Sequence, residues 1–244
     1  MHDLGDFSLR DVAECTAHVR RLGHGAGSME EAASRIVKYL YDDLTDRHGA
    51  QRACALVRFY KTHPYGLLDA ERRRFAEARS AGEFAAPSAR FLALLAAAGE
   101  ERGASSVTSS PDHEAIPFEL AGDTAHVPTM IRHVTQLGVD VGEAAPPASS
   151  GWPSATALDL PHGNAFHVAA ATGGPEIPIH DTRLSHHKIR SIMGFGGVLP
   201  GGDLFVVVLF TRVRIADTAR DLFKTLALGV KVGVMSFERG PIFC

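Results

Sequence analysis

The stretch "IRSIMGFGGVLPGGDLFVVVLF", residues 189–210, places five glycines between two apolar runs. Two structures have this composition: a glycine-rich loop that binds phosphate, and a tight turn between two strands. In the dinucleotide-binding pattern G-x-G-x-x-G, Gly194 and Gly196 fit the first two positions, but Leu199 holds the third. A strand-like run follows where that pattern needs a helix, and the GK[ST] ending of a P-loop is absent. The stretch is therefore predicted to be a β-hairpin.

The turn of this hairpin is predicted at "LPGGDL". Pro200 cannot continue a strand ladder, and Gly201 and Gly202 can both adopt positive φ angles. Glycines inside the preceding strand indicate either a β-bulge or a place where another group approaches the backbone closely. These glycines are Gly194, Gly196 and Gly197. The run "LFVVVLF" is apolar on both faces, which predicts a central strand that is covered on both sides.

Patterns outside the hairpin predict the remaining elements. Ser8 can cap a helix that ends at Gly23, and Ser28 with Glu31 has the spacing of a capping box at the start of a second helix. Residues 89–99 have helix-favouring composition, but their short length between turn signals favours a buried strand. The other predicted elements are a strand at 53–61, a polar helix at 69–82, a short helix from Pro128, a short strand at 165–171 and a helix at 216–236.

Composition excludes several classes of protein. The formal charge of the 244 residues is -3, so no general attraction to nucleic acid or acidic membranes is expected. No apolar run approaches the roughly 18 residues that span a bilayer, and the amino-terminal residues lack a signal-peptide pattern. The three cysteines form no CxxC pair, which is typical of a reduced, cytoplasmic protein. Cys15 and Cys54 are expected to be core residues, with a redox-sensing Cys15 as the alternative if it is exposed.

Histidines are the chemically suggestive residues. Imidazole is a common ligand of zinc, copper and haem iron, but the spacing here fits no known zinc signature. A metal or haem site and a set of solvent-facing loop histidines therefore both remain open. The candidate metal ligands, which fall within 26 residues, are His162, His167, His180, His186 and His187.

Basic residues nearby could hold an anionic ligand. Lys188 and Arg190 alternate along the predicted strand, so they would share a face, although a solvated strand edge explains them equally. No nucleophile elbow, zinc-protease motif or carboxylate pair is present, so the chain is not expected to be an enzyme.

Longer stretches resemble a known family. Residues 189–235, together with "LGDFSLRDVAECTAHVRRLG" (4–23), "RIVKYLYDDL" (35–44) and "ALVRFYKTHPYGLLD" (55–69), resemble the GAF-like sensory domain at the amino terminus of many bacterial histidine kinases and related signalling proteins. The resemblance covers nearly the whole chain except about residues 100–165. No kinase, cyclase or phosphatase portion follows, so we expect a standalone receptor or an input domain.

The resemblance implies an α+β fold. A central antiparallel sheet of five or six strands would carry the amino- and carboxy-terminal helices on one face and a small-molecule pocket on the other. As a single domain, 1–244 would divide into amino-terminal helices (1–50), first strands (51–99), a pocket-covering segment (100–187), the hairpin (188–214) and the last helix (216–236). The residues expected to bind the ligand are His167, Ile177, His180, His186, Lys188 and Arg190.

The implied function is a cytoplasmic sensor in a two-component system. It would bind a small ligand or cofactor, form a homodimer through its terminal helices, and signal to a histidine kinase or another output domain. Two alternatives stay open. One is a metal- or haem-binding protein, or redox enzyme, that uses the histidines of 162–187. The other is a structural dimerisation module whose pocket is filled by its own side chains.

Overall fold

The structure is a computed structural model, and it describes residues 1–47, 49, 51–79, 87, 89–99, 115–117, 165–168 and 188–243. The helix predicted from Pro128 lies outside the described residues. None of the helices within these ranges is long and apolar enough to cross a membrane.

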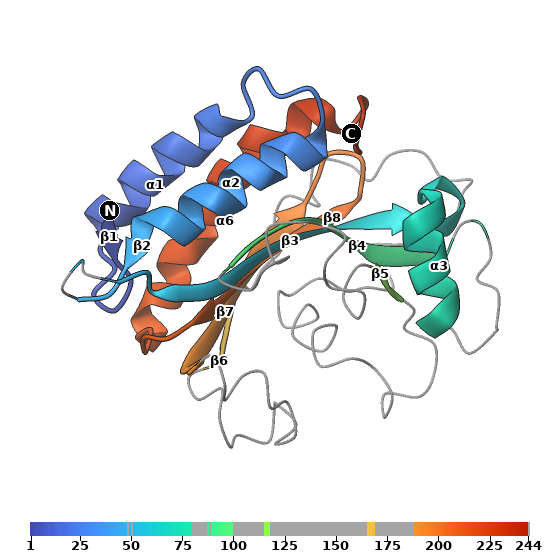
Figure 1. The fold of residues 1–244 in the computed structure, drawn as a ribbon. Helices are drawn as coiled ribbons and strands as arrows, with labels where there is room; N and C mark the ends of the chain where they lie inside the picture. Colours follow the sequence, from blue (N-terminus) through green and yellow to red (C-terminus); the bar gives the residue numbers. More distant parts are fainter. Residues whose placement is uncertain are drawn as a thin grey trace.

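A six-stranded sheet forms the centre of the described structure (Figure 1). Its strand order is β5-β4-β3-β8-β7-β6, and every neighbouring pair is antiparallel. The strands are β3 (Cys54–Pro64), β4 (Arg90–Gly99), β5 (Ala115–Pro117), β6 (Ala165–Val168), β7 (Ser191–Val198) and β8 (Leu204–Thr211). The run "LFVVVLF" forms β8 in the interior of the sheet and is almost wholly buried, as its two apolar faces predict.

The predicted hairpin is confirmed as β7 and β8. Pairing runs from Ser191↔Thr211 to Val198↔Leu204 without a register shift, so the β-bulge alternative is wrong. The close-approach alternative holds at Gly196, because a Cβ atom there would lie 2.1 Å from the carbonyl oxygen of Phe205.

The two glycines of the turn have different structural roles. Gly202 has a φ of +87°, a backbone conformation that side chains with a Cβ atom rarely adopt. Gly201, which could also adopt a positive φ, does not have one. Its N–H instead donates to the carboxylate of Glu238, which ties the hairpin turn to the carboxy-terminal segment.

Three helices cover one face of the sheet: α1 (Leu9–Leu22), α2 (Met29–Asp43) and α6 (Arg220–Val234) (Figure 1). Ser8 caps α1 in a complete capping box with Asp11. Ser28 caps α2, but Glu31 bonds the N–H of Gly27 rather than that of Ser28, so the predicted box is only half formed. This one-sided helix layer on an antiparallel sheet confirms the α+β expectation.

Smaller elements complete the described chain. Strands β1 (His2–Asp3) and β2 (Leu44–Thr45) pair in parallel, and α3 (Ala70–Arg79) packs beside β4 and β5. Short 3-10 helices lie at Tyr65–Leu67, Asp217–Ala219 and Met235–Phe237.

Helices α1 and α6 run side by side in the same direction. The rings of Phe7 and Phe223 stack at 5.2 Å near their amino ends, and Gly23 meets Gly233 near their carboxyl ends. A Cβ atom on Gly233 would lie 2.8 Å from the carbonyl oxygen of Val19. The two backbones are therefore in direct contact along what we call the α1–α6 seam.

The two faces of β3 have different neighbours. Val57 and Phe59 belong to the hydrophobic core between the sheet and the helices. Because successive side chains of a strand point to opposite faces, Arg58 and Tyr60 lie on the face away from α1, α2 and α6. The core under the helices also includes Met193, Phe195, Phe205, Val207 and Leu209 from β7 and β8.

Candidate functional site

The structure describes only part of the site expected from the sequence. His162, Ile177, His180, His186 and His187 lie outside the described residues. The backbone of His167 lies in β6, where it pairs with Met193. Among the described residues, no group of three or more histidine, cysteine or acidic side chains is arranged to hold a metal ion.

Lys188 and Arg190 precede the strand on which they were expected. Strand β7 begins at Ser191, and Lys188 occupies a turn with a φ of +55°. Both residues are exposed. The argument that they share a strand face was therefore wrong, because strand alternation does not apply to residues outside the strand.

Polar side chains gather instead on β3, on the sheet face away from the helices. Arg58, Tyr60 and Thr62 occupy alternate positions, and all three are buried. Their neighbours across the sheet are apolar, with Val208 opposite Arg58 and Val206 opposite Tyr60. A buried guanidinium and a buried phenol in apolar surroundings are uncommon, because burial of either group costs free energy unless it forms hydrogen bonds.

The hydroxyl of Tyr60 is the most deeply buried polar group on this face. Tyr60 is 0% exposed, and the polar group beside its oxygen is the guanidinium of Arg58. Burial raises the pKa of the Tyr60 phenol, and the nearby positive charge of Arg58 partly opposes that shift. The phenol is therefore neutral near pH 7 and can both donate and accept a hydrogen bond.

Arg58 supplies the positive charge beside this hydroxyl. Its guanidinium carbon lies 5.8 Å from the centroid of the Phe210 ring, within the range of a cation–π contact. Arg58 and Tyr60 thus place hydrogen-bond donors among apolar neighbours, which are Phe210 and the valines of β8. Such surroundings suit a small molecule with an apolar body and a carboxylate or carbonyl oxygen. We call Arg58, Tyr60 and Phe210 the β3 site.

The β3 site was not among the residues expected from the sequence. The segment "ACALVRFYK" is a strand, as predicted, but the prediction did not separate its polar residues by face. The available signal was the alternation of Arg58 and Tyr60 with the apolar Val57 and Phe59. This alternation is lost farther along the strand, because Lys61 and His63 place polar side chains on the other face as well.

An ionic cluster lies at the turn-proximal end of β3. The ammonium of Lys61 and the guanidinium of Arg90 both pair with the carboxylate of Asp203. Thr62 donates to the same carboxylate at 3.3 Å and accepts the N–H of Leu204 at 2.8 Å. Burial lowers the pKa of Lys61, and the charge of Asp203 opposes that shift. Because each group has partners, this cluster is best explained as a structural link between β3 and the hairpin turn.

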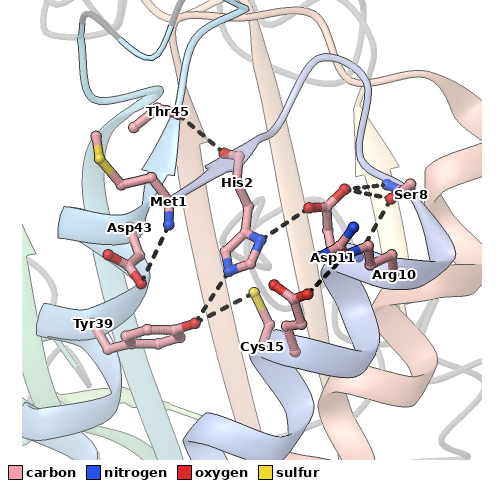
Figure 2. A network of polar contacts seen from close by, with 10 residues as sticks. Met1, His2, Ser8, Arg10, Asp11, Cys15, Tyr39, Asp43 and Thr45 are labelled. Atoms are coloured by element: carbon pink, nitrogen blue, oxygen red, sulfur yellow. Dashed lines mark hydrogen bonds and ion pairs between the residues drawn. The ribbon is translucent and has the colours of Figure 1, made fainter.

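A second polar network joins β1 to helices α1 and α2 (Figure 2). Nδ1 of His2 lies 2.9 Å from Oδ1 of Asp11, and Nε2 lies 3.5 Å from the hydroxyl of Tyr39. The Tyr39 hydroxyl in turn lies 3.6 Å from the sulfur of Cys15. The order Asp-His-Tyr-Cys superficially resembles a relay to a nucleophile.

The thiol at the end of that relay is not activated. Cys15 is 0% exposed, and burial raises its pKa to about 11. Burial also raises the pKa of Cys54, to about 12. A nucleophilic cysteine needs a lowered pKa and access to solvent, and neither thiol has these properties. The packing role expected for both cysteines agrees with their burial, and the network of His2 serves to fasten β1 to the helix layer.

Comparison with known proteins gives structural similarity alone. No protein-family profile and no curated protein matches the chain. The order of the elements, with terminal helices on one face of an antiparallel sheet, matches the arrangement that the sequence resemblance implies. The described part of the chain thus has an α+β fold of the kind that the resemblance to GAF domains implies.

Solved structures with a similar course of the chain include GAF domains and a reductase. A GAF domain from a phosphoenolpyruvate-protein phosphotransferase of Coxiella burnetii is 10% identical, with 93% of this chain and 94% of that chain covered and a TM-score of 0.49. A protein of Burkholderia vietnamiensis described as a GAF sensor is 11% identical over 93% of this chain and 96% of that chain, with a TM-score of 0.47. The free methionine-R-sulfoxide reductase of Neisseria meningitidis, in complex with its substrate, is 11% identical over 98% of this chain and 99% of that chain, with a TM-score of 0.47.

Proposed function

We propose that this GAF-like domain is a cytoplasmic sensor that binds a small organic ligand at the β3 site and signals to a partner or an output module. The observation that carries the proposal is a buried guanidinium, Arg58, beside a fully buried hydroxyl, Tyr60, with apolar neighbours on the next strand. Polar groups buried among apolar side chains are costly unless their hydrogen-bonding capacity is used, so a bound acceptor would lower the free energy of the folded state.

The chemistry of the β3 site favours a ligand with a carboxylate or carbonyl group. Arg58 provides a permanent positive charge, and Tyr60 provides a neutral hydroxyl next to it. Phe210 and the valines of β8 offer apolar contact for the rest of the molecule. The ligand would therefore be an amphipathic small acid or a carbonyl compound.

Strand β3 supplies a direct route from the ligand to the helices. Phe59 lies between Arg58 and Tyr60 in the sequence and packs in the core under the helix layer. A ligand that bound one arrangement of β3 more tightly than another would shift the population of helix-layer conformations. In a two-component system the receiver of that shift would be a histidine kinase domain.

The exposed side of α6 supports the homodimer part of the proposal. Leu228, Val232 and Met235 follow one another along the helix at helical spacing and are all exposed. A second copy that packed on this stripe would bury apolar surface that otherwise faces water.

The test combines ligand release with variants of the β3 site. Freshly purified protein is denatured and the released small molecules are weighed by mass spectrometry. The shift in melting temperature is then measured with the released compound and with a panel of small carboxylates. We expect Tyr60→Phe and Arg58→Met to weaken binding by about tenfold or more, since each removes a polar contact to the ligand.

Tyr41→Phe is the matched control, because Tyr41 is also buried but lies on α2 in the helix layer. It should leave ligand binding unchanged. Equal binding by the parent protein and a folded Tyr60→Phe variant would contradict the proposal.

An absorbance spectrum with elemental analysis tests the metal alternative and comes first. A haem band or stoichiometric metal would favour the metal alternative, with these candidate ligands: His162, His167, His180, His186 and His187. A colourless, metal-free protein would leave the organic ligand as the proposed occupant.

A further inference from the structure

The carboxy-terminal residues after α6 dock onto the amino end of α2. The N–H of Met29 donates to the carbonyl oxygen of Pro241 at 3.0 Å, and the N–H of Glu30 donates to that of Ile242 at 2.8 Å. The third N–H of the helix, on Glu31, is satisfied by the side chain of Ser28. Two of the donors that a helix start leaves open are thus filled by a separate segment of chain. We call residues 241–243 the tail.

The ring of Phe243 occupies a place built by two basic side chains. The guanidinium carbon of Arg72 lies 4.1 Å from the ring centroid, and the imidazole of His63 meets the ring edge-on, with centroids 5.2 Å apart and planes at 83°. A cation held against an aromatic face is attracted to its π electrons, and the edge-on imidazole suits the same ring. We call His63, Arg72 and the amino end of α2 the tail cradle.

Arg72 is held in place by groups other than the tail. Its side chain is 9% exposed and pairs with Glu30 at 2.9 Å and with Asp69. It also donates to the carbonyl oxygen of Leu94. The guanidinium plane is thus fixed by α2, α3 and β4 together, so the cradle is organised independently of Phe243. Glu30 contributes twice, with its N–H to the tail and its carboxylate to Arg72.

His63 adds an independent sign that the cradle is a binding site. The residue is 7% exposed, and its Nε2 lies 3.2 Å from the carbonyl oxygen of Leu67. Its buried Nδ1 has no hydrogen-bond partner among the residues that the structure describes. A buried imidazole nitrogen of this kind is an acceptor that a ligand with a suitable donor could use.

The tail is only partly buried. Pro241 is exposed, and Ile242 and Phe243 pack half-buried against the edge of the hydrophobic core. A partly buried segment at the edge of a core opens locally more often than the whole domain unfolds. We propose that the tail cradle is a peptide-binding site, that the tail is its resident ligand, and that the tail leaves and returns while the domain stays folded.

The ligand that fits the cradle is an extended peptide with two free carbonyl groups followed by an aromatic residue. Backbone carbonyls bind the helix N–H groups without regard to side chain, and the aromatic residue supplies specificity through Arg72. While tethered, the tail has a high effective concentration, so a free peptide competes poorly with it.

Amide hydrogen exchange tests whether the tail leaves on its own. In the parent protein, the amides of Met29 and Glu30 should exchange about tenfold or more faster than amides in the middle of α2. Phe243→Ala should accelerate both further, and Ser236→Ala, an exposed change just before the tail, should not. Exchange of Met29 and Glu30 at the same rate as the middle of α2 would overturn the proposal, because the tail would then leave only on unfolding.

A peptide titration tests recognition. The probe is a labelled, amidated peptide of residues 237–243, Phe-Glu-Arg-Gly-Pro-Ile-Phe, and its control ends in alanine. The Phe243→Ala protein should bind the probe about tenfold or more tightly than the parent protein does, and it should ignore the control peptide. Phe243→Leu serves in its place if Phe243→Ala does not fold. A folded variant that binds no probe, or equal binding of both peptides, would overturn the proposal.

Discussion

The ammonium of Lys61 and the carboxylate of Asp203 form an ion pair that joins β3 to the turn of the β7–β8 hairpin. The Lys61 side chain is 2% exposed and that of Asp203 18% exposed, so little water screens the pair. Removing one partner should therefore have a different effect from removing the other.

Asp203→Asn should destabilise the fold by about 3 kcal/mol, because it leaves the buried charge of Lys61 without a counter-charge. Lys61→Met removes the buried charge itself and should cost about 1 kcal/mol or less. The double variant should recover most of the loss caused by Asp203→Asn. Urea unfolding of the three variants checks this, and equal losses for the two single variants would show that the pair is screened by water.

Gly233→Ala should destabilise the domain although alanine is the better helix former by about 1 kcal/mol. The new Cβ atom would lie 2.8 Å from the carbonyl oxygen of Val19, and a backbone atom cannot move aside without separating α1 from α6. We expect a net loss of about 1 to 2 kcal/mol by thermal or urea unfolding. Thr225→Ala on the exposed side of α6 is the control and should be nearly neutral. A melting temperature that rises in Gly233→Ala would refute the close contact of the α1–α6 seam.

His63 should make stability fall on acidification. Burial, together with the positive charge of Lys61, lowers the pKa of His63 from 6.5 to about 4. Between these two values the unfolded chain binds the proton and the folded chain does not, so the free energy of unfolding decreases as the pH falls from 6.5 toward 4. The contribution is about 3 kcal/mol near pH 4.

Carboxylates titrate in part of the same range, so the His63 effect is read as a difference between variants. Urea unfolding of the parent and of His63→Gln at pH 7 and pH 4.5 gives that difference. The parent should lose more stability on acidification than His63→Gln does. Equal losses would mean that His63 keeps its ordinary pKa in the folded protein.

Cys15 and Cys54 should resist thiol reagents. Burial raises the pKa of these thiols to about 11 and about 12, so almost no thiolate is present at pH 8. In a Cys244→Ser background, the rate of labelling by iodoacetamide should follow unfolding and increase steeply in urea. Rapid labelling of Cys15 in the native protein would instead support the redox-sensing alternative.

Much of the sheet can be predicted from local sequence. Residues 89–99 are predicted as a strand against their helix-favouring composition, and β4 confirms the prediction. Both faces of β4 are buried, so its sequence is apolar throughout and hydrophobic periodicity cannot distinguish a strand from a helix. The short length of the segment between turn signals makes that distinction correctly. Likewise, the missing third glycine and the strand-like run after the turn are enough to exclude a phosphate loop at residues 189–210.

Long-range contacts could not be predicted. The capping pattern at Ser28 indicates where α2 begins. No local pattern reveals that the first two N–H groups of the helix donate to the carbonyl oxygens of Pro241 and Ile242. In the sequence Arg72 is one of three consecutive arginines on a polar helix, and only the fold shows that it lies against Phe243, 171 residues later. The prediction that Lys188 and Arg190 share a strand face was wrong for a local reason, since the strand begins one residue after Arg190.

The parallel course of α1 and α6 also has an electrical consequence. Aligned peptide dipoles give each helix a positive amino end and a negative carboxyl end, and two parallel neighbours place like ends together. Side chains of opposite charge lie at both ends of the pair. The first turns of α1 and α6 carry Asp11 and Asp221, and the last turns carry Arg20, Arg21 and Lys231. These side chains reduce the repulsion between the like ends of the two helix dipoles. Salt should screen both the repulsion between the dipoles and the attraction of the side-chain charges to them.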